Sequence, residues 1–271
     1  MNSYWKESTN ETNYGKLNNK IETQTCIIGA GITGIATAYE LAKQGQKVVI
    51  LEKEKVAMGV TANTTGKITS QHGLIYKYLI DNFGMEDARE YLEANEEAIK
   101  TIQKNIENNK IECDLEVQDA YIYTNEDSEV IKIKEEVDAL KKLGFDAEYC
   151  TQTELPFNVL SAIKFKNQAQ FNVRKYLLGL LKALDEMNVE IYENSKVVDV
   201  KKDGEKYDVI TEKGVVKSKN VVICTHYPII NFPGFHFLKM YQERSYIVAA
   251  ETKQKLFNRN VYIKSNARGI F

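Results

Sequence analysis

The stretch QTCIIGAGITGIATAYELAKQGQKVVILE, residues 24–52, decides the fold of this 271-residue chain. It opens with an apolar, β-favouring run at 24–29, continues as a helical pattern over 32–43 and closes on a second β-branched run at 46–51. Short apolar runs that end in glycine are typical of buried parallel strands. The stretch therefore predicts one βαβ unit with a right-handed crossover and a parallel sheet.

Three glycines between the first strand and the helix form the pattern GxGxxG. Gly29 permits a tight turn, Gly31 lets backbone N–H groups approach a pyrophosphate, and Gly34 lets the helix lie close to the strand. Glu52 ends the second strand 18 positions after Gly34, where its carboxylate would accept ribose hydroxyls and repel a 2′-phosphate. The pattern predicts a site for FAD or NAD. A turn that binds no nucleotide is the alternative.

Composition and charge favour a small-molecule ligand. Hydrophobic residues make up 43% of the chain, charged residues 27%, and the net charge is −2, which argues against attraction to nucleic acid or an anionic membrane. The uncharged stretch 23–39 is too short and too polar to span a membrane. Four cysteines and three histidines show no metal-ligand spacing. We expect a cytoplasmic protein with reduced thiols and no metal site.

The remaining patterns predict an α/β chain in two parts. The further elements expected are helices at 85–109, 128–143 and 173–187 and strands at 120–124, 146–150, 189–192, 196–200, 207–211, 215–217, 220–224, 240–250 and 260–264. The later strands include a β-meander. We assign 22–80 and 151–230 to a dinucleotide-binding domain, 81–150 and 231–271 to a second, incomplete α+β domain, and 1–21 to an N-terminal extension.

The wider sequence resembles a known family. The loop GVTANTTGKIT at 59–69, the helix–strand pair at 173–200 and the strand closing on VVICT at 221–225 are similar to FAD-dependent oxidoreductases of the D-amino-acid oxidase and glycine oxidase superfamily. This resemblance implies a Rossmann-like FAD-binding domain with a parallel sheet and a β-meander, plus a second α+β substrate domain. It also implies FAD as the cofactor and oxidation of an amine or amino-acid-like substrate by hydride transfer to the flavin.

The resemblance further implies which residues contact FAD. In the family, the loop after the ribose carboxylate bends over the pyrophosphate and flavin, and a strand after the second helix holds adenine through backbone groups. By position, the implied residues are Gly29, Ala30, Gly31, Ile32, Thr33, Gly34, Glu52, Lys53, Ala62, Thr64, Thr65, Gly66, Lys67, Ile68, Val197 and Thr225. Val197 also suits a core position, and the bulky His226 departs from the family's Ala-Thr-Gly turn.

A substrate-binding pair is expected on the predicted strand 240–250. Arg244 and Tyr246 share one face of that strand, and an arginine can hold a carboxylate through two hydrogen bonds. The amino-acid oxidases of the family use such a pair, so the resemblance makes these two residues the candidates and leaves the catalytic residue unassigned. A solvated arginine paired with Glu243 or Glu251 is the alternative.

The stretches at 3–5, 69–73 and 241–246 resemble bacterial family members that carry a C-terminal Rieske domain. Family members continue well past this length, so we expect an N-terminal part of a longer enzyme that encloses the flavin ring only partly. Its partners would be a small-molecule substrate and a Rieske domain or C-terminal partner chain. Two alternatives stay open: an NAD-dependent dehydrogenase, and a non-catalytic nucleotide-binding fragment that needs a partner chain.

Overall fold

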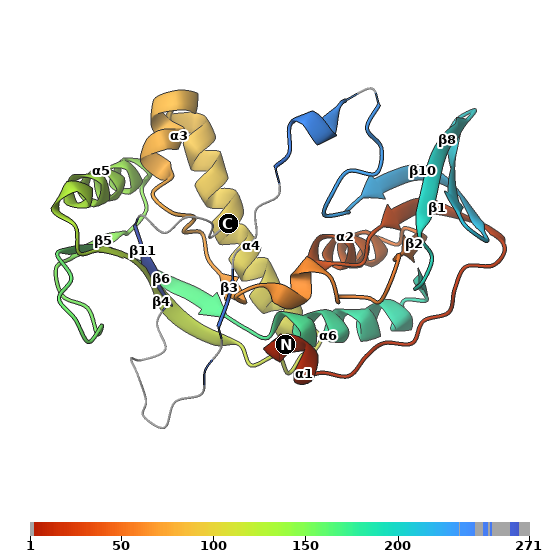
Figure 1. Cartoon of the computed structure of the whole chain (residues 1–271), viewed down its shortest axis with the longest axis horizontal. Coiled ribbons are helices and arrows are strands. Elements are labelled where there is room, and N and C mark those ends of the chain that lie inside the picture. The colour runs from red at the N-terminus through yellow and green to blue at the C-terminus, as the bar shows by residue number, and fades with distance from the viewer. Residues whose placement is uncertain (1–2, 233, 242–245, 249, 251–260, 266–271) are drawn as a thin grey trace. The chain divides into compact units, whose positions relative to one another are not determined.

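The computed structural model describes residues 3–232, 234–241, 246–248, 250 and 261–265, which belong to two compact units (Figure 1). Unit 1 consists of Met1–Thr64, Asn108–Cys113 and Asn172–Gln242, and unit 2 of Thr65–Glu107, Asp114–Phe171 and Glu243–Phe271. This division differs from the expected domain boundaries. Unit 2 takes 65–80 and 151–171 from the expected dinucleotide-binding domain, and unit 1 takes 1–21, 108–113 and 231–242.

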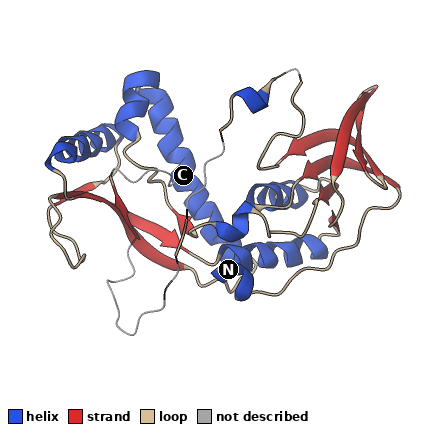
Figure 2. Ribbon diagram, viewed as in Figure 1, coloured by secondary structure: helices blue, strands red, loops and turns tan. Residues whose placement is uncertain are grey.

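Unit 1 is built on a six-stranded sheet with the order β7-β2-β1-β10-β9-β8 (Figure 2). Its strands are β1 Lys20–Ile28, β2 Val48–Leu51, β7 Glu190–Tyr192, β8 Val197–Asp203, β9 Lys206–Thr211 and β10 Val215–Ile223. β7, β2, β1 and β10 run parallel, and β10, β9 and β8 form an antiparallel meander. The predicted parallel sheet and meander are present, with the strands expected at 215–217 and 220–224 joined into one.

Buried apolar strands and two helices form the core of unit 1. Residues 25–28 of β1 and all of β2 are buried. The helix α2 Ile32–Lys43, whose bounds match the prediction, packs against α6 Val173–Glu186. α6 begins after Asn172, whose side chain accepts a hydrogen bond from the amide of Lys175 at 3.1 Å. This cap and a buried leucine face fix α6 beside α2.

Unit 2 contains a five-stranded sheet with the order β11-β4-β6-β3, in which β5 also pairs with β6. Its strands are β3 Lys67–Ile68, β4 Glu116–Thr124, β5 Glu148–Cys150, β6 Ser161–Gln170 and β11 Val261–Lys264. Three helices contribute buried residues to one core with this sheet: α3 Tyr76–Phe83, α4 Met85–Asn108 and α5 Asp127–Leu143. The short elements α1 Tyr4–Glu7, η1 Val60–Asn63 and η2 His236–Leu238 belong to unit 1.

The sequence does not predict β6, although β6 pairs with three other strands. Asn167 within it adopts a φ of 58°, and its pairing with β4 shifts register between Gln118 and Ala120, so the apolar alternation is interrupted. Gln168 is fully buried, and its Oε1 accepts a hydrogen bond from the amide of Ser70 at 2.7 Å. A polar sequence can therefore form an interior strand because its polar groups find partners inside unit 2.

Two further expectations concern the C-terminal region and membranes. The strand predicted at 240–250 is absent from residues 240–241, 246–248 and 250, and its other residues lie outside the described part, whereas the strand expected at 260–264 corresponds to β11. Among the helices that the structure describes, none has the length and apolar character needed to cross a membrane. The described His, Cys, Asp and Glu side chains form no group of three placed to hold a metal ion.

Glu136 of α5 caps α3 from outside that helix and yields a stability prediction. It is fully buried, and its two carboxylate oxygens accept the amides of Tyr76 and Lys77 at 2.8 Å each. Glu136→Ala leaves both amides without this acceptor, so we expect the free energy of unfolding to fall by about 2–3 kcal/mol. Urea unfolding measures the loss. The exposed Glu135 provides the control, since Glu135→Ala should cost less than about 0.5 kcal/mol; equal losses would contradict the assignment.

Candidate dinucleotide-binding site

The glycine-rich turn joins β1 to α2 beside the end of β10. Gly29 has a φ of 105°, and a Cβ at this position would lie 2.7 Å from the carbonyl oxygen of Cys224. A Cβ on Gly34 would overlap the carbonyl oxygen of Gly29. Both glycines are therefore required by the backbone packing of the turn itself. Gly29 therefore lies close to the Cys224 carbonyl even though the bulky His226 follows two positions later. The His226 side chain is exposed.

Gly31 differs from the other two glycines, because the fold does not require it. Its φ is −85°, and beyond its chain neighbours a Cβ would meet only the Thr61 hydroxyl within 4 Å, at 3.1 Å. The same hydroxyl accepts a hydrogen bond from the amide of Ile32 at 3.1 Å. In the part of the chain that the structure describes, no group accepts a hydrogen bond from the amide of Gly31. A bare amide beside open space suits a phosphate oxygen.

Glu52 lies at the same turn, as the sequence predicts. Its Oε2 accepts a hydrogen bond from the amide of Ala30 at 2.9 Å, and its Oε1 accepts one from the amide of Glu54 at 3.0 Å. The backbone of Glu52 is fixed from both sides, since its N–H donates to Tyr192 at 2.8 Å and its carbonyl accepts from Ser195 at 2.8 Å. A carboxylate held this way can accept ribose hydroxyls beside a diphosphate.

The start of α2 is electrostatically suited to an anion. Its first turn has no acidic residue, and Ile32 and Thr33 are exposed, so the partial positive charge of the helix N-terminus faces solvent. Lys53 forms an exposed ion pair with Glu54 at 3.4 Å. These groups fit the dinucleotide that the sequence predicts.

The predicted cofactor loop is divided between the two units. In unit 1, Ala62 is fully buried, and the carbonyl of Thr64 accepts a hydrogen bond from an indole N–H at 2.7 Å. In unit 2, Thr65 precedes Gly66, which has a φ of 72° and accepts a hydrogen bond from the amide of Phe171 at 3.0 Å. The structure thus supports both halves of the loop through contacts within their own units.

The second half of the loop continues into a cluster of polar side chains. Lys67 and Ile68 form β3, and burial lowers the pKa of the Lys67 ammonium. Burial and the charge of Lys67 also lower the pKa of His72, whose Nδ1 lies 2.7 Å from the Tyr91 hydroxyl. The buried side-chain amide of Gln71 has no hydrogen-bond partner among the described residues. The segment therefore presents a neutral imidazole and an unsatisfied amide.

The other residues predicted to bind the cofactor or the substrate lie in different environments. Val197 is buried in the core of unit 1 with Val209 and Val216, which agrees with its alternative assignment as a core residue and leaves its backbone contact with adenine a prediction. The hydroxyl of Thr225 donates to the carbonyl of Tyr227 at 2.8 Å. Tyr246 is 93% exposed. Arg244 lies outside the described residues.

Sequence reasoning missed Glu193, a buried carboxylate next to the end of β7. It accepts hydrogen bonds from the amides of Val56 at 2.9 Å and Tyr14 at 3.2 Å, from the Lys55 ammonium at 2.7 Å, and from the Thr12 hydroxyl. Although burial raises the pKa of Glu193, its hydrogen bonds to Lys55 and Thr12 hold it below the ordinary value. The sequence did contain a signal for Glu193: it is a charged residue directly after the predicted strand 189–192, just as Glu52 directly follows the predicted strand 46–51.

Comparisons with known proteins show which family the chain resembles. Residues 24–271 match the family model named DAO and described as FAD dependent oxidoreductase. The Rieske-named protein YhfW of Bacillus subtilis (strain 168) is 40% identical over 252 residues, which cover 93% of this chain and 49% of that protein. Gamma-glutamylputrescine oxidoreductase of Escherichia coli (strain K12) is 23% identical over 229 residues, covering 82% of this chain and 53% of that protein. The chain thus spans about half the length of these curated relatives.

A solved structure shows the same fold. The crystal structure of glycine oxidase from Geobacillus kaustophilus superimposes with a TM-score of 0.60 at 17% identity, covering 76% of this chain and 55% of that chain. The predicted fold class is therefore confirmed.

Gly31→Ala separates a cofactor role of this glycine from a folding role. Only the Thr61 hydroxyl has to move, so we expect stability to change by less than about 1 kcal/mol, while FAD affinity falls about tenfold or more as the methyl group crowds the diphosphate. Equilibrium dialysis and urea unfolding give the two quantities.

Two other glycines are the controls for this variant. Gly34→Ala should prevent folding because of the overlap with Gly29, whereas Gly15→Ala, with nothing within 4 Å of the new Cβ, should change neither quantity. Wild-type FAD affinity in Gly31→Ala would contradict the cofactor role.

The lowered pKa of Glu193 predicts acid sensitivity. Its contribution to stability is fully present above its ordinary pKa of 4.5 and is lost as the pH falls through the lowered value. We therefore expect Glu193→Gln to lose about 2 kcal/mol at neutral pH and to approach the wild type as the pH falls below 4.5 through the lowered pKa, as measured by urea unfolding across this range. Glu212→Gln, which removes an exposed pair with Lys16, should show neither effect. A pH-independent difference between Glu193→Gln and the wild type would exclude this assignment.

Proposed function

Because the chain belongs to the DAO family of FAD-dependent oxidoreductases, we propose that it binds FAD and oxidises an amine or amino-acid-like substrate. The observation that carries the proposal is that the bare Gly31 amide and the Glu52 carboxylate, which is held by the Ala30 amide, lie at the same turn. The family match favours FAD over NAD as the dinucleotide at that turn.

The chain's own residues supply binding and orientation. The bare Gly31 amide and the exposed start of α2 would hold the pyrophosphate, Glu52 would accept the ribose hydroxyls, and the loop from Ala62 to Ile68 would contact the flavin side. When bound, FAD supplies the two-electron acceptor for cleavage of a C–H bond next to nitrogen.

The relatives support finer parts of this proposal. The Escherichia coli relative is named for γ-glutamylputrescine, an amine derivative, which supports an amine-containing small molecule as substrate. The Bacillus subtilis relative is named for a Rieske 2Fe-2S centre, which supports a Rieske domain or partner chain as electron acceptor. Cys26 and Cys113 are buried thiols, and we include a cytoplasmic location in the proposal on that basis.

A visible spectrum of the purified chain tests the cofactor. We expect FAD to bind with a shifted flavin absorption band and NADH to leave no comparable signal. Glu52→Gln should weaken FAD binding about tenfold through the lost charge-assisted hydrogen bonds, while the exposed Glu54→Gln should not. Binding of NADH without flavin would select the NAD-dependent dehydrogenase instead.

Anaerobic reduction tests the activity separately. Bleaching of the bound flavin by primary and secondary amines or by amino acids, with the oxidised product identified, would support amine oxidation. Stable FAD binding with no bleaching across that panel would contradict an oxidase activity of this chain and leave the non-catalytic binding fragment as the better description.

A further inference from the structure

The N-terminal segment reaches the cofactor loop through side chains that the sequence places far from it. The Trp5 indole N–H donates to the carbonyl of Thr64 at 2.7 Å. The Ser3 hydroxyl donates to the carbonyl of Ala62. Ser3 also caps α1, since its side chain accepts a hydrogen bond from the amide of Lys6. Two donors on one short helical turn therefore hold two alternate carbonyls of the loop.

The same segment is anchored to the start of α6. The Thr9 hydroxyl donates to the carbonyl of Trp5 at 2.5 Å and accepts a hydrogen bond from the Arg174 guanidinium. The side-chain amide of Asn172 donates to the Ser8 hydroxyl at 3.1 Å. Arg174 and Asn172 are buried, so a continuous chain of hydrogen bonds runs from the first turn of α6 to Thr64.

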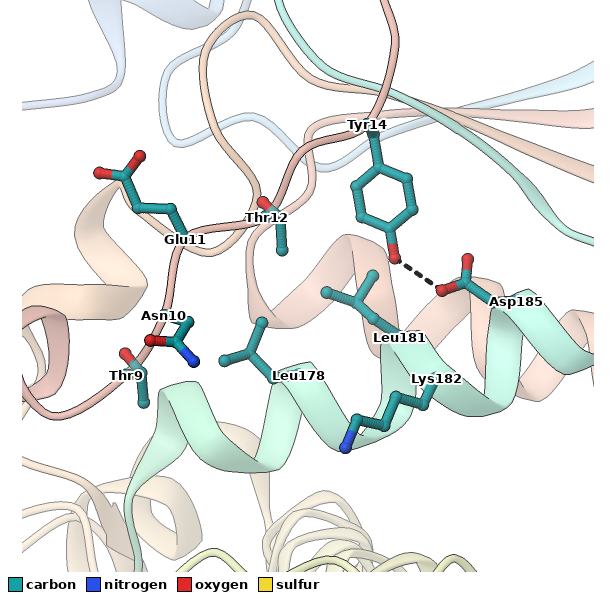
Figure 3. Close-up of a pocket in the computed structure, with 9 residues that line it drawn as sticks. All are labelled: Thr9, Asn10, Glu11, Thr12, Tyr14, Leu178, Leu181, Lys182 and Asp185. Atoms are coloured by element: carbon teal, nitrogen blue, oxygen red, sulfur yellow. Dashed lines mark hydrogen bonds between the residues drawn. The ribbon is translucent and has the colours of Figure 1, made fainter.

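Beyond Thr9 the segment follows α6 over a groove. The groove has a volume of about 360 Å³ and lies between residues 9–14 and the α6 side chains Leu178 and Leu181. Figure 3 shows the side chains that line it. The Tyr14 hydroxyl donates to Asp185 at 3.0 Å, and the Tyr14 amide donates to Glu193. The segment is thus fixed at both ends of the groove, and the end at Trp5 is the one that contacts the loop.

Resting on the proposed FAD binding, we propose that Trp5 is a positioning residue for the cofactor. Its indole N–H fixes the Thr64 carbonyl and thereby holds η1 in place, where Thr61 contacts the amide of Ile32. A loop that is ordered before the cofactor arrives loses less conformational entropy on binding. Removing the donor lowers FAD affinity without removing any group that touches FAD.

Trp5→Phe in the full chain tests this role, because phenylalanine keeps an aromatic ring and loses the N–H donor. We expect FAD affinity, measured by equilibrium dialysis, to fall about tenfold. AMP affinity should change by less than about twofold. AMP retains the adenine and the ribose that Glu52 would bind, but it lacks the flavin part of FAD that the loop from Ala62 to Ile68 would contact. Glu7→Gln, an exposed residue of the same helical turn, should change neither affinity.

The emission of Trp5 provides a second readout. It is the only tryptophan in the sequence, so saturation of the unsubstituted chain with FAD should quench its emission, and AMP should not. Quenching by FAD supports the position of Trp5 beside the cofactor, and its absence at saturation would overturn it.

The affinities separate this inference from the proposed function. Unchanged FAD affinity in Trp5→Phe, or an equal loss of FAD and AMP affinity, would overturn the positioning role and leave FAD binding intact. Failure of the unsubstituted chain to bind FAD would overturn the proposed function and this inference together.

Discussion

Helix α2 begins where it does because Gly34 lacks a Cβ and lies directly on the carbonyl oxygen of Gly29. Gly29 in turn adopts a positive φ beside the carbonyl of Cys224 at the end of β10. These backbone contacts require glycine at both positions of the turn between β1 and the helix. Within unit 1, Glu52 and Thr61 accept hydrogen bonds from the amides of Ala30 and Ile32 at that helix start.

The side chains near the turn divide into groups that hold structure and groups left for a ligand. The Glu52 carboxylate accepts hydrogen bonds from the amides of Ala30 and Glu54. It retains further lone pairs that could accept ribose hydroxyls. Thr61 covers Ile32 and leaves Gly31 uncovered. The protein satisfies most of its own polar groups at the turn, which preorganises the remainder for the cofactor.

Buried charges on unit 1 serve the N-terminal segment. Glu193 holds it through Tyr14 and Thr12, and Arg174 holds it through Thr9. A charge removed from water is costly unless it is paired, so Glu193, which is paired with Lys55, constrains the segment strongly, whereas Arg174 adds one hydrogen bond to it. Through Trp5 the segment also contacts the Thr64 carbonyl of the proposed cofactor loop.

The sequence by itself determined the βαβ unit, the bounds of α2, the glycine fingerprint and the position of Glu52, because each depends on residues within one short stretch. Tertiary structure decided the rest. β6 is a strand that pairs with β3, β4 and β5, its buried Gln168 accepts a hydrogen bond from the amide of Ser70, and Trp5 contacts a carbonyl 59 positions away. Local periodicity records which face of an element is buried, but it does not record which distant donor meets which acceptor, since that depends on how the chain brings separate segments together.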